Sequence, residues 1–263
     1  MPTPRDVLAL IERIRCISCE DERHALIKTL SAVERPTILS FLNAHGVNLC
    51  AGSSATWSAF RASDVLLRDG VALEVALPWL DQPVGLNMNG TDFIPLLLRH
   101  LSPRRVAVYG TASPWLDEGI ERLKERTPHD YVDAQHGFHS VEHYIARARE
   151  LQPDVIVLAM GMPRQEEVAV QLKRALDHKV LIVNGGAIID FLAGRFTRAP
   201  AALQRIGLEW AFRLVQEPRR LFRRYCVGAF GFAHTVLLMR RAAIRSSGRS
   251  SSAPAPAPMH KEL

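Results

Sequence analysis

Residues 153–200 carry the clearest structural pattern in the chain and read PDVIVLAMGMPRQEEVAVQLKRALDHKVLIVNGGAIIDFLAGRFTRAP. Residues 155–159 form a short apolar run bounded by turn residues, which is typical of a strand buried on both faces. Residues 165–176 then predict a helix with acidic residues in its first turn, where the helix dipole favours them. A second apolar run, residues 180–183, ends in a pair of glycines. The pattern therefore predicts a strand–helix–strand unit of a parallel sheet.

Polar residues follow the ends of these two strands, at the edge where open α/β sheets bind their ligands. They are Gln165, Asn184 and Asp190. Asp190 has apolar residues on both sides in the sequence. Because an ionised carboxylate is costly to bury alone, we expect it to have a charged or hydrogen-bonding partner.

The same alternation of strand, glycine turn and helix recurs through the preceding sequence. Further strands are predicted over residues 37–42, 64–70, 105–110 and 131–134. Helices are predicted over residues 7–14, 23–30, 57–61, 94–101 and 142–151, with one more beginning at residues 111–113. Thr91 or Asp92 is the expected N-cap of the helix over 94–101. The alternation predicts a Rossmann-like, doubly wound and mostly parallel α/β sheet.

Charge divides the chain into an acidic body and a basic C-terminal region. Residues 195–245 hold eleven Arg, no Lys and two acidic residues, a formal net charge of +9, whereas residues 1–194 carry −4. A segment this rich in arginine implies an anionic partner, which could be phosphate groups, anionic lipid or nucleic acid.

The basic region also contains an uncharged and mostly apolar run of fifteen residues, 225–239. At about 1.5 Å per residue a helix of this length spans roughly 22 Å, short of the roughly 30 Å hydrocarbon core of a bilayer. We therefore expect this run to lie in the membrane interface, and we expect removal of the chain from Leu203 onward to leave a soluble body.

The expected organisation has four segments. They are N-terminal helices (1–34), an α/β domain (35–202), a basic amphipathic appendage that associates with a membrane (203–245) and a disordered tail rich in Ser, Ala and Pro (246–263). The four Cys form no disulfide framework at this length, and charged residues interrupt the first apolar run, so we expect a reducing compartment and no signal peptide.

Asp69 is the strongest candidate for a catalytic residue, because it ends a buried strand beside Gly70 and should emerge at the ligand-binding edge. The alternative is an ordinary Asp-Gly turn. Asn43 ends another strand at the same edge. Asn89 and Gly90, with Asp92, end a third segment or simply cap a helix. Gln165 could only begin its helix, and His136 could be a surface imidazole.

Several motifs are missing from the sequence. There is no GxxxxGK[ST] phosphate loop, no GxGxxG after the first strand and no Gly-x-Ser-x-Gly elbow. There is also no Asp-x-Asp and no cluster of residues at metal-ligand spacing. We therefore expect no metal and no cofactor, with phosphate held by arginines and by backbone N–H groups at glycine turns such as Gly110, Gly161 and Gly185.

A set of short motifs, in order over about residues 35–225, supports a family resemblance. They are Asp69-Gly70, Asn89-Gly90-Thr91-Asp92, residues 161–166 (GMPRQE), residues 185–194, Arg198-Ala199-Pro200, Leu208-Glu209-Trp210, Arg213-Leu214 and residues 217–220 (EPRR). Together they resemble the WecG/TagA/CpsF family of bacterial glycosyltransferases, glycosyltransferase family 26. Two positions depart from the family pattern, Phe41 where Thr is common and Asn87 where Arg is common, so the resemblance does not extend to the identity of the sugar.

The resemblance implies an inverting, metal-independent hexosyltransferase of exopolysaccharide or other cell-surface polysaccharide synthesis. Such enzymes use a UDP-sugar donor and a polyprenyl-diphosphate-linked saccharide as acceptor, and they lie peripherally on the cytoplasmic face of the bacterial inner membrane, with anionic lipid as a partner. Asp69 falls on the general base, and Asn43, Gln165 and Asp190 fall on pocket positions. The diphosphate-binding positions are Arg213, Arg220 and Arg224.

Two other functions fit parts of the sequence. One is a nucleotide-sugar-binding regulator without catalysis, which would need neither Asp69 nor the arginine cluster. The other is a nucleic-acid binder, which would interleave aromatic and basic residues across an exposed face. Trp210 and Phe212 follow an amphipathic pattern instead, so we expect no nucleic-acid partner. A homo-oligomer is left open.

Overall fold

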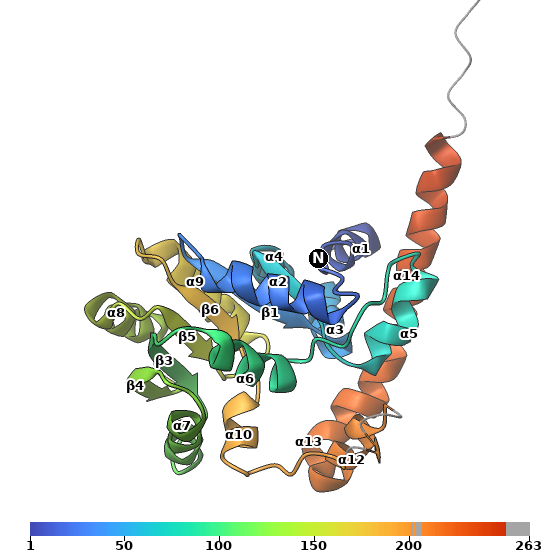
Figure 1. The fold of residues 1–263 in the computed structure, drawn as a ribbon. Helices are drawn as coiled ribbons and strands as arrows, with labels where there is room; N and C mark the ends of the chain where they lie inside the picture. The colour runs from blue at the N-terminus through green and yellow to red at the C-terminus, as the bar shows by residue number, and fades with distance from the viewer. Residues whose placement is uncertain (201, 204–206, 251–263) are drawn as a thin grey trace, which may run out of the picture.

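The computed structural model describes residues 1–200, 202–203 and 207–250, with the side chains of Arg220, Arg224 and residues 246–250 outside the description. Its centre is one six-stranded sheet in the order β2-β1-β6-β5-β3-β4, and every pairing is parallel (Figure 1). The strands are β1 (Thr37–Leu42), β2 (Val65–Arg68), β3 (Arg105–Gly110), β4 (Asp130–His136), β5 (Val155–Leu158) and β6 (Leu181–Asn184). The prediction of a doubly wound parallel α/β sheet is confirmed.

Strands β5 and β6 are buried along their whole length. Helices cover both faces of the sheet, so alternate residues of β5 enter different cores: Val155 and Val157 belong to one cluster, Ile156 and Leu158 to another. This double burial is the reason that both strands are continuous apolar runs in the sequence.

One face of the sheet packs against α2 (Glu20–Ser31), α6 (Gly90–His100), α7 (Trp115–Arg126) and α10 (Ile188–Leu192). The other face packs against α8 (Val141–Leu151) and α9 (Arg164–Ala175). At the β1–β2 end, a further cluster joins α1 (Pro4–Ile11), α3 (Ala44–Gly52), α4 (Ser54–Arg61), α5 (Val71–Trp79) and α14 (Gly228–Ser250). The N-terminal helices are thus packed into the body of the protein.

Helix α6 begins earlier than expected. Its N-cap is Asn89, whose Oδ1 accepts from the backbone N–H of Asp92 at 3.0 Å, so neither Thr91 nor Asp92 has that role. Asparagine is a strong capping residue because its side-chain oxygen satisfies an amide of the first turn. Helices α3 and α5 were not predicted from the sequence.

The C-terminal region contains α12 (Glu209–Gln216), α13 (Pro218–Phe222), a π-helical turn η1 (Arg223–Val227) and the long α14. On α14 the side chains of Phe232, Val236 and Met239 are buried and join the cluster that contains α1 and α3. The expectation that the whole apolar run lies on a membrane is therefore wrong for these three residues, because one face of the helix is part of the core.

The expected tail starts inside α14, which continues to Ser250, and residues 251–263 lie outside the described part of the chain. Within the described residues, every helix is too short or too polar to span a lipid bilayer.

Candidate active site

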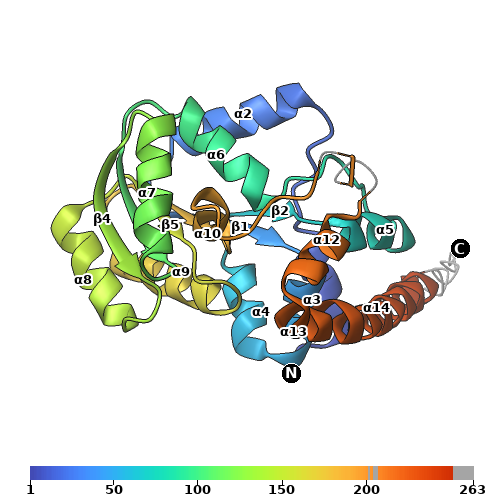
Figure 2. The same cartoon turned by 90° about the horizontal axis from the view of Figure 1, so that it is seen from below.

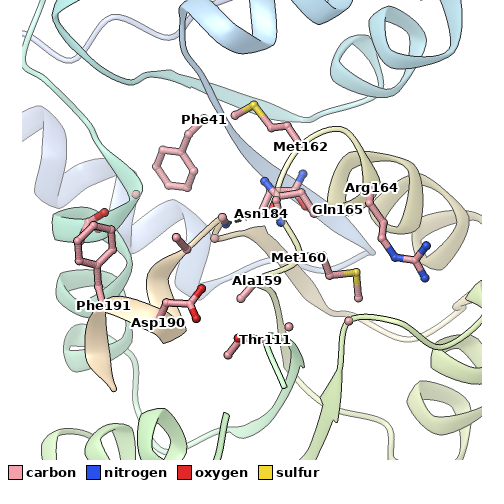
Figure 3. Close-up of a pocket in the computed structure, with 18 of the residues that line it drawn as sticks. Phe41, Thr111, Ala159, Met160, Met162, Arg164, Gln165, Asn184, Asp190 and Phe191 are labelled. Carbon is pink, nitrogen blue, oxygen red and sulfur yellow. Dashed lines mark hydrogen bonds between the residues drawn. The ribbon is translucent and has the colours of Figure 1, made fainter. Parts of the chain in front are cut away.

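A pocket of about 340 Å³ opens at the carboxyl edge of the sheet and takes residues that follow all six strands. The sheet has a switch point at this edge. Strands β3 and β5 are neighbours, but the chain continues from β3 to β4 on one side of them and from β5 to β6 on the other side. Open α/β sheets bind ligands at such a point. Nine predicted site residues line it, namely Asn43, Asp69, Gly90, Gly110, Gly161, Gln165, Gly185, Asp190 and Arg213. Gln165 and Asn184 lie at its centre, with Asp190 and Phe191 on one side and Met160 on the other (Figure 3).

Asp69 and Asn43 are joined in the pocket wall. Nδ2 of Asn43 donates to Oδ2 of Asp69 at 3.3 Å, while Oδ1 of Asn43 caps α3 by accepting from the Gly46 N–H at 3.1 Å. The cap fixes which side of the Asn43 amide faces Asp69. The Asp69 carboxylate is therefore held at the end of β2 and half-buried beside the pocket.

The turn that carries Asp69 is held in place by Arg68, a residue that was not predicted from the sequence to belong to the site. Arg68 is buried, and its guanidinium donates to the carbonyls of Gly70, Val84 and Gly85 and pairs with Glu74. A buried arginine needs such partners. The sequence feature that could have identified Arg68 is a charged residue at the end of an apolar strand, directly before the candidate base.

Asn87, one of the departures from the family pattern, also supports this turn. Its Oδ1 accepts from the N–H of Gly70 at 3.0 Å, and Gly70 has a φ of +87°, a conformation that favours glycine. Phe41, the other departure, lines the pocket and meets Phe93 edge to face with ring centroids 6.3 Å apart.

Gln165 ties two glycine turns together. Its Oε1 accepts from the N–H of Gly161 at 3.2 Å and from the N–H of Gly186 at 2.9 Å. Gly161 follows β5 and Gly186 follows β6, so a single side-chain oxygen fixes the distance between the ends of two neighbouring strands. Gln165 therefore does more than begin helix α9.

Glu166 sets the orientation of the Gln165 amide from behind the pocket. It is 1% exposed, and its Oε1 accepts from Nε2 of Gln165 at 2.8 Å, which leaves Oε1 of Gln165 facing the two glycines. Oε2 of Glu166 has no hydrogen-bond partner among the described residues. Burial raises the pKa of the Glu166 carboxyl from 4.5 to about 7.

The Glu166 carboxyl should make stability depend on pH. Because its pKa is higher in the folded protein, its contribution to the free energy of unfolding falls as pH rises from about 4.5 to about 7 and is level above that. Glu166→Gln removes this titration, so the difference between wild type and variant should change by roughly 2–3 kcal/mol between pH 5 and pH 8. Urea unfolding at each pH measures it.

The exposed neighbour Glu167 supplies the control. Glu167→Gln makes the same chemical change one position along the same helix, and its unfolding is measured at the same pH values. A pH-independent difference between wild type and Glu166→Gln would show that Glu166 is ionised throughout this range.

Asp190 has the partner that its apolar neighbours predicted. Oδ1 of Asp190 accepts from Nη1 of Arg195 at 3.0 Å. The guanidinium of Arg213 lies 4.9 Å from the ring centroid of Phe191, which places a cation at the rim of the pocket. The site thus combines a neutralised carboxylate with a stacked arginine.

Four amides of the glycine turns have partners within the protein. The N–H groups of Gly161 and Gly186 bond to Gln165, that of Gly185 donates to the Leu158 carbonyl at 2.7 Å, and that of Gly137 donates to the Gly110 carbonyl. Phosphate bound by the amides of Gly161 or Gly185 would have to share or replace these bonds, and a role for glycine-turn amides stays a prediction. Positive elements at the pocket include the N-terminal end of α6, where Gly90 and Thr91 line it, and the side chains of Arg164 and Arg213.

The remaining predicted residues lie elsewhere. Asn89 caps α6 behind Gly90, and His136 stacks on His139 with ring centroids 3.9 Å apart, outside the pocket lining. The side chains of Arg220 and Arg224 lie outside the described part of the structure. Among residues 1–200, 202–203 and 207–250, no group of three His, Cys, Asp or Glu side chains could hold a metal ion.

A parallel α/β sheet with a polar pocket at its carboxyl edge, a carboxylate in the wall and an arginine at the rim is typical of an enzyme that binds an anionic small molecule. The chain belongs to the glycosyl transferase WecG/TagA/CpsF family, whose model matches residues 8–246. The family assignment made from the motifs is confirmed, and with it the assignment as a glycosyltransferase.

The chain is also similar to two proteins from Staphylococcus aureus, strains MW2 and NCTC 8325 / PS 47. Each is an N-acetylglucosaminyldiphosphoundecaprenol N-acetyl-beta-D-mannosaminyltransferase that is 24% identical over 210 residues, a match that covers 78% of this chain and 82% of the relative.

Proposed function

We propose that this protein is an inverting glycosyltransferase that moves a sugar from a UDP-linked donor to a saccharide carried on a polyprenyl diphosphate. The product would be an intermediate of a bacterial cell-surface polysaccharide, such as an exopolysaccharide. The observation that carries the proposal is the Asp69 carboxylate, held by Asn43 in the wall of the pocket at the switch point of the sheet. Family membership and the names of the relatives support the reaction class.

In the proposed reaction, the acceptor hydroxyl forms a bond to the anomeric carbon of the donor sugar, and the bond from that carbon to the diphosphate breaks. Asp69 takes the hydroxyl proton, a role worth about 10²–10⁴ in rate. The leaving diphosphate gains negative charge, which Arg213 at the rim, with Arg220 and Arg224 of the same region, neutralises. Arginine suits this task because its fork binds phosphate in a bidentate manner.

The assay that tests the proposal starts from the names of the relatives. UDP-N-acetylmannosamine should be tried first, against an N-acetylglucosaminyl diphosphate carried on a short lipid chain, followed by a panel of other UDP-sugars. Phe41 departs from the family pattern and lines the pocket, so the donor sugar of a relative cannot simply be transferred to this protein. The panel determines which sugar is preferred. Transfer from none of the donors to any diphosphate-linked acceptor would contradict the proposal.

Chelation should leave the proposed activity intact. The sequence lacks Asp-x-Asp, and the proposed mechanism uses arginine to neutralise the diphosphate. We expect initial rates with EDTA to stay within about twofold of those without it. A loss of activity that Mg²⁺ or Mn²⁺ restores would show that a divalent cation takes part.

The proposed location is the cytoplasmic face of the inner membrane, where the protein is held peripherally. An acceptor on a polyprenyl chain is confined to a membrane, and each arginine near an anionic lipid surface contributes about 1 kcal/mol of attraction. On α14, Phe230, Leu237 and Ile244 remain exposed beside Arg241 and Arg245. This exposed face is the proposed contact of the C-terminal region with lipid.

A further inference from the structure

Exposed large apolar side chains are concentrated in two parts of the described chain, helix α5 and residues 207–250. Outside these two parts, only Met1 and Phe138 are exposed large apolar residues of the described chain. Helix α5 is therefore the one element of the α/β body that presents such a surface. Its exposed residues are Val71, Val75 and Trp79, here named the α5 stripe, and the last two are each 62% exposed.

The α5 stripe lies along one side of its helix, because residues four apart share a helical face. The opposite side of α5 is buried in the core through Leu73 and Leu77. Glu74, the helix's acidic residue, pairs with the buried Arg68 at 3.1 Å. The exposed side of α5 is thus apolar, and the acidic residue of the helix is paired with a cation. Packing of the core does not require large apolar side chains on this exposed side.

The α5 stripe adjoins both the pocket and the C-terminal region. Helix α5 begins directly after Asp69 and Gly70, and a Cβ added to Gly207 would lie 3.0 Å from Cγ2 of Val71. Beyond the end of α5, Asp81 pairs with Arg240 of α14. In Figures 1 and 2, α5 lies on the same side of the molecule as α12 and α14.

Charge and residue type favour a lipid surface as the partner. Helix α14 contains four arginines and no acidic residue, and Arg241 and Arg245 are exposed. Anionic lipid complements this charge, and Trp is enriched where proteins meet the bilayer interface. A second copy of the chain bound across a two-fold axis would instead set these arginines against each other, which like-charge repulsion disfavours.

We propose that the α5 stripe is a membrane-contact surface of the α/β body, which holds the pocket at an anionic bilayer together with α14. The proposal rests on the proposed function only for the reason why the pocket should lie at a membrane. Binding of the stripe to lipid needs no substrate. Because α5 starts at the Asp69 turn, contact through this stripe places the catalytic carboxylate within a helix length of the lipid surface.

The test uses the full chain with Val75→Gln and Trp79→Gln together, and a matched variant with Val75→Leu and Trp79→Phe. Co-sedimentation with vesicles of phosphatidylglycerol and phosphatidylcholine measures binding. The Gln variant should bind about tenfold more weakly, and the apolar variant should bind about as well as wild type. Circular dichroism checks that both variants are folded, and neither position is a pocket residue.

A second measurement separates this proposal from the proposed function. The Gln variant should keep wild-type turnover on a water-soluble short-chain acceptor and lose turnover on a long-chain acceptor in vesicles. Equal vesicle binding by all three proteins would overturn the proposal, and so would a change of oligomeric state on gel filtration, which would make the stripe a contact between copies. Absence of transfer with every acceptor would contradict the proposed function alone, since the binding result stands without it.

Discussion

Replacing Asp69 with asparagine should lower turnover at least about a hundredfold while leaving the fold and donor binding near normal. The amide cannot accept the proton of the acceptor hydroxyl. It can still accept from Nδ2 of Asn43, which donates to Oδ2 of Asp69 at 3.3 Å, so the turn keeps its hydrogen bond. Steady-state rates with the best donor of the panel measure the effect on turnover, and isothermal titration with UDP measures donor binding.

Glu74→Gln is a useful comparison for Asp69→Asn. Glu74 lies in the first turn of α5, directly after the turn that carries Asp69, and it pairs with Arg68 outside the pocket. Its replacement should lower stability modestly and leave turnover within a few fold of wild type. If Asp69→Asn also stayed within about threefold of wild type, another group would have to take the proton.

Ending the chain at Val227 should unfold or aggregate most of the protein. The deletion removes Phe232, Val236 and Met239, which are buried against α1 and α3. Burial of each such side chain contributes roughly 1.5–3 kcal/mol, so the loss is at least about 4 kcal/mol, a large part of the 5–15 kcal/mol typical of a domain. Urea unfolding and gel filtration of the shortened protein measure the outcome.

Two single substitutions on α14 isolate the cause. Met239 is 0% exposed and Leu237 is 50% exposed on the same helix. Met239→Ala should reduce the free energy of unfolding by about 2–5 kcal/mol, and Leu237→Ala by no more than about 0.5 kcal/mol. Equal small effects, or a shortened protein as stable as wild type, would mean that α14 is a separable appendage, as the sequence alone suggested.

The sheet was predictable because its strands are buried on both faces and its turns contain glycine. Continuous apolar runs such as residues 155–158 have few other interpretations when helical patterns lie between them. The placement of Asp69, Asn43 and Gln165 at one edge followed from the parallel arrangement. Helix α3 was missed because Gly46 and Gly52 weaken its helical signal, and α5 was missed because it is apolar almost all round.

The contacts that organise the pocket were less predictable, since they depend on which strands are neighbours. Gln165 reaches Gly186 only because β5 lies beside β6, and Arg195 reaches Asp190 only because the chain turns after α10. The apolar run of α14 was misread for a related reason. Periodicity identifies an apolar face but does not say whether protein or lipid covers it.

The order of the strands bears on how this chain folds during synthesis. The first strand, β1, pairs on one side with β2, which follows it closely, and on the other with β6, whose residues are made about 140 positions later. Until β6 emerges from the ribosome, one edge of β1 has no neighbouring strand. The contact between α1 and α14 forms later still, because α14 is synthesised after β6. Pairings this distant in sequence slow folding, and unpaired edges of apolar strands are prone to aggregate. Nascent chains that stall before residue 181 should therefore depend on chaperones, whereas completed chains should not.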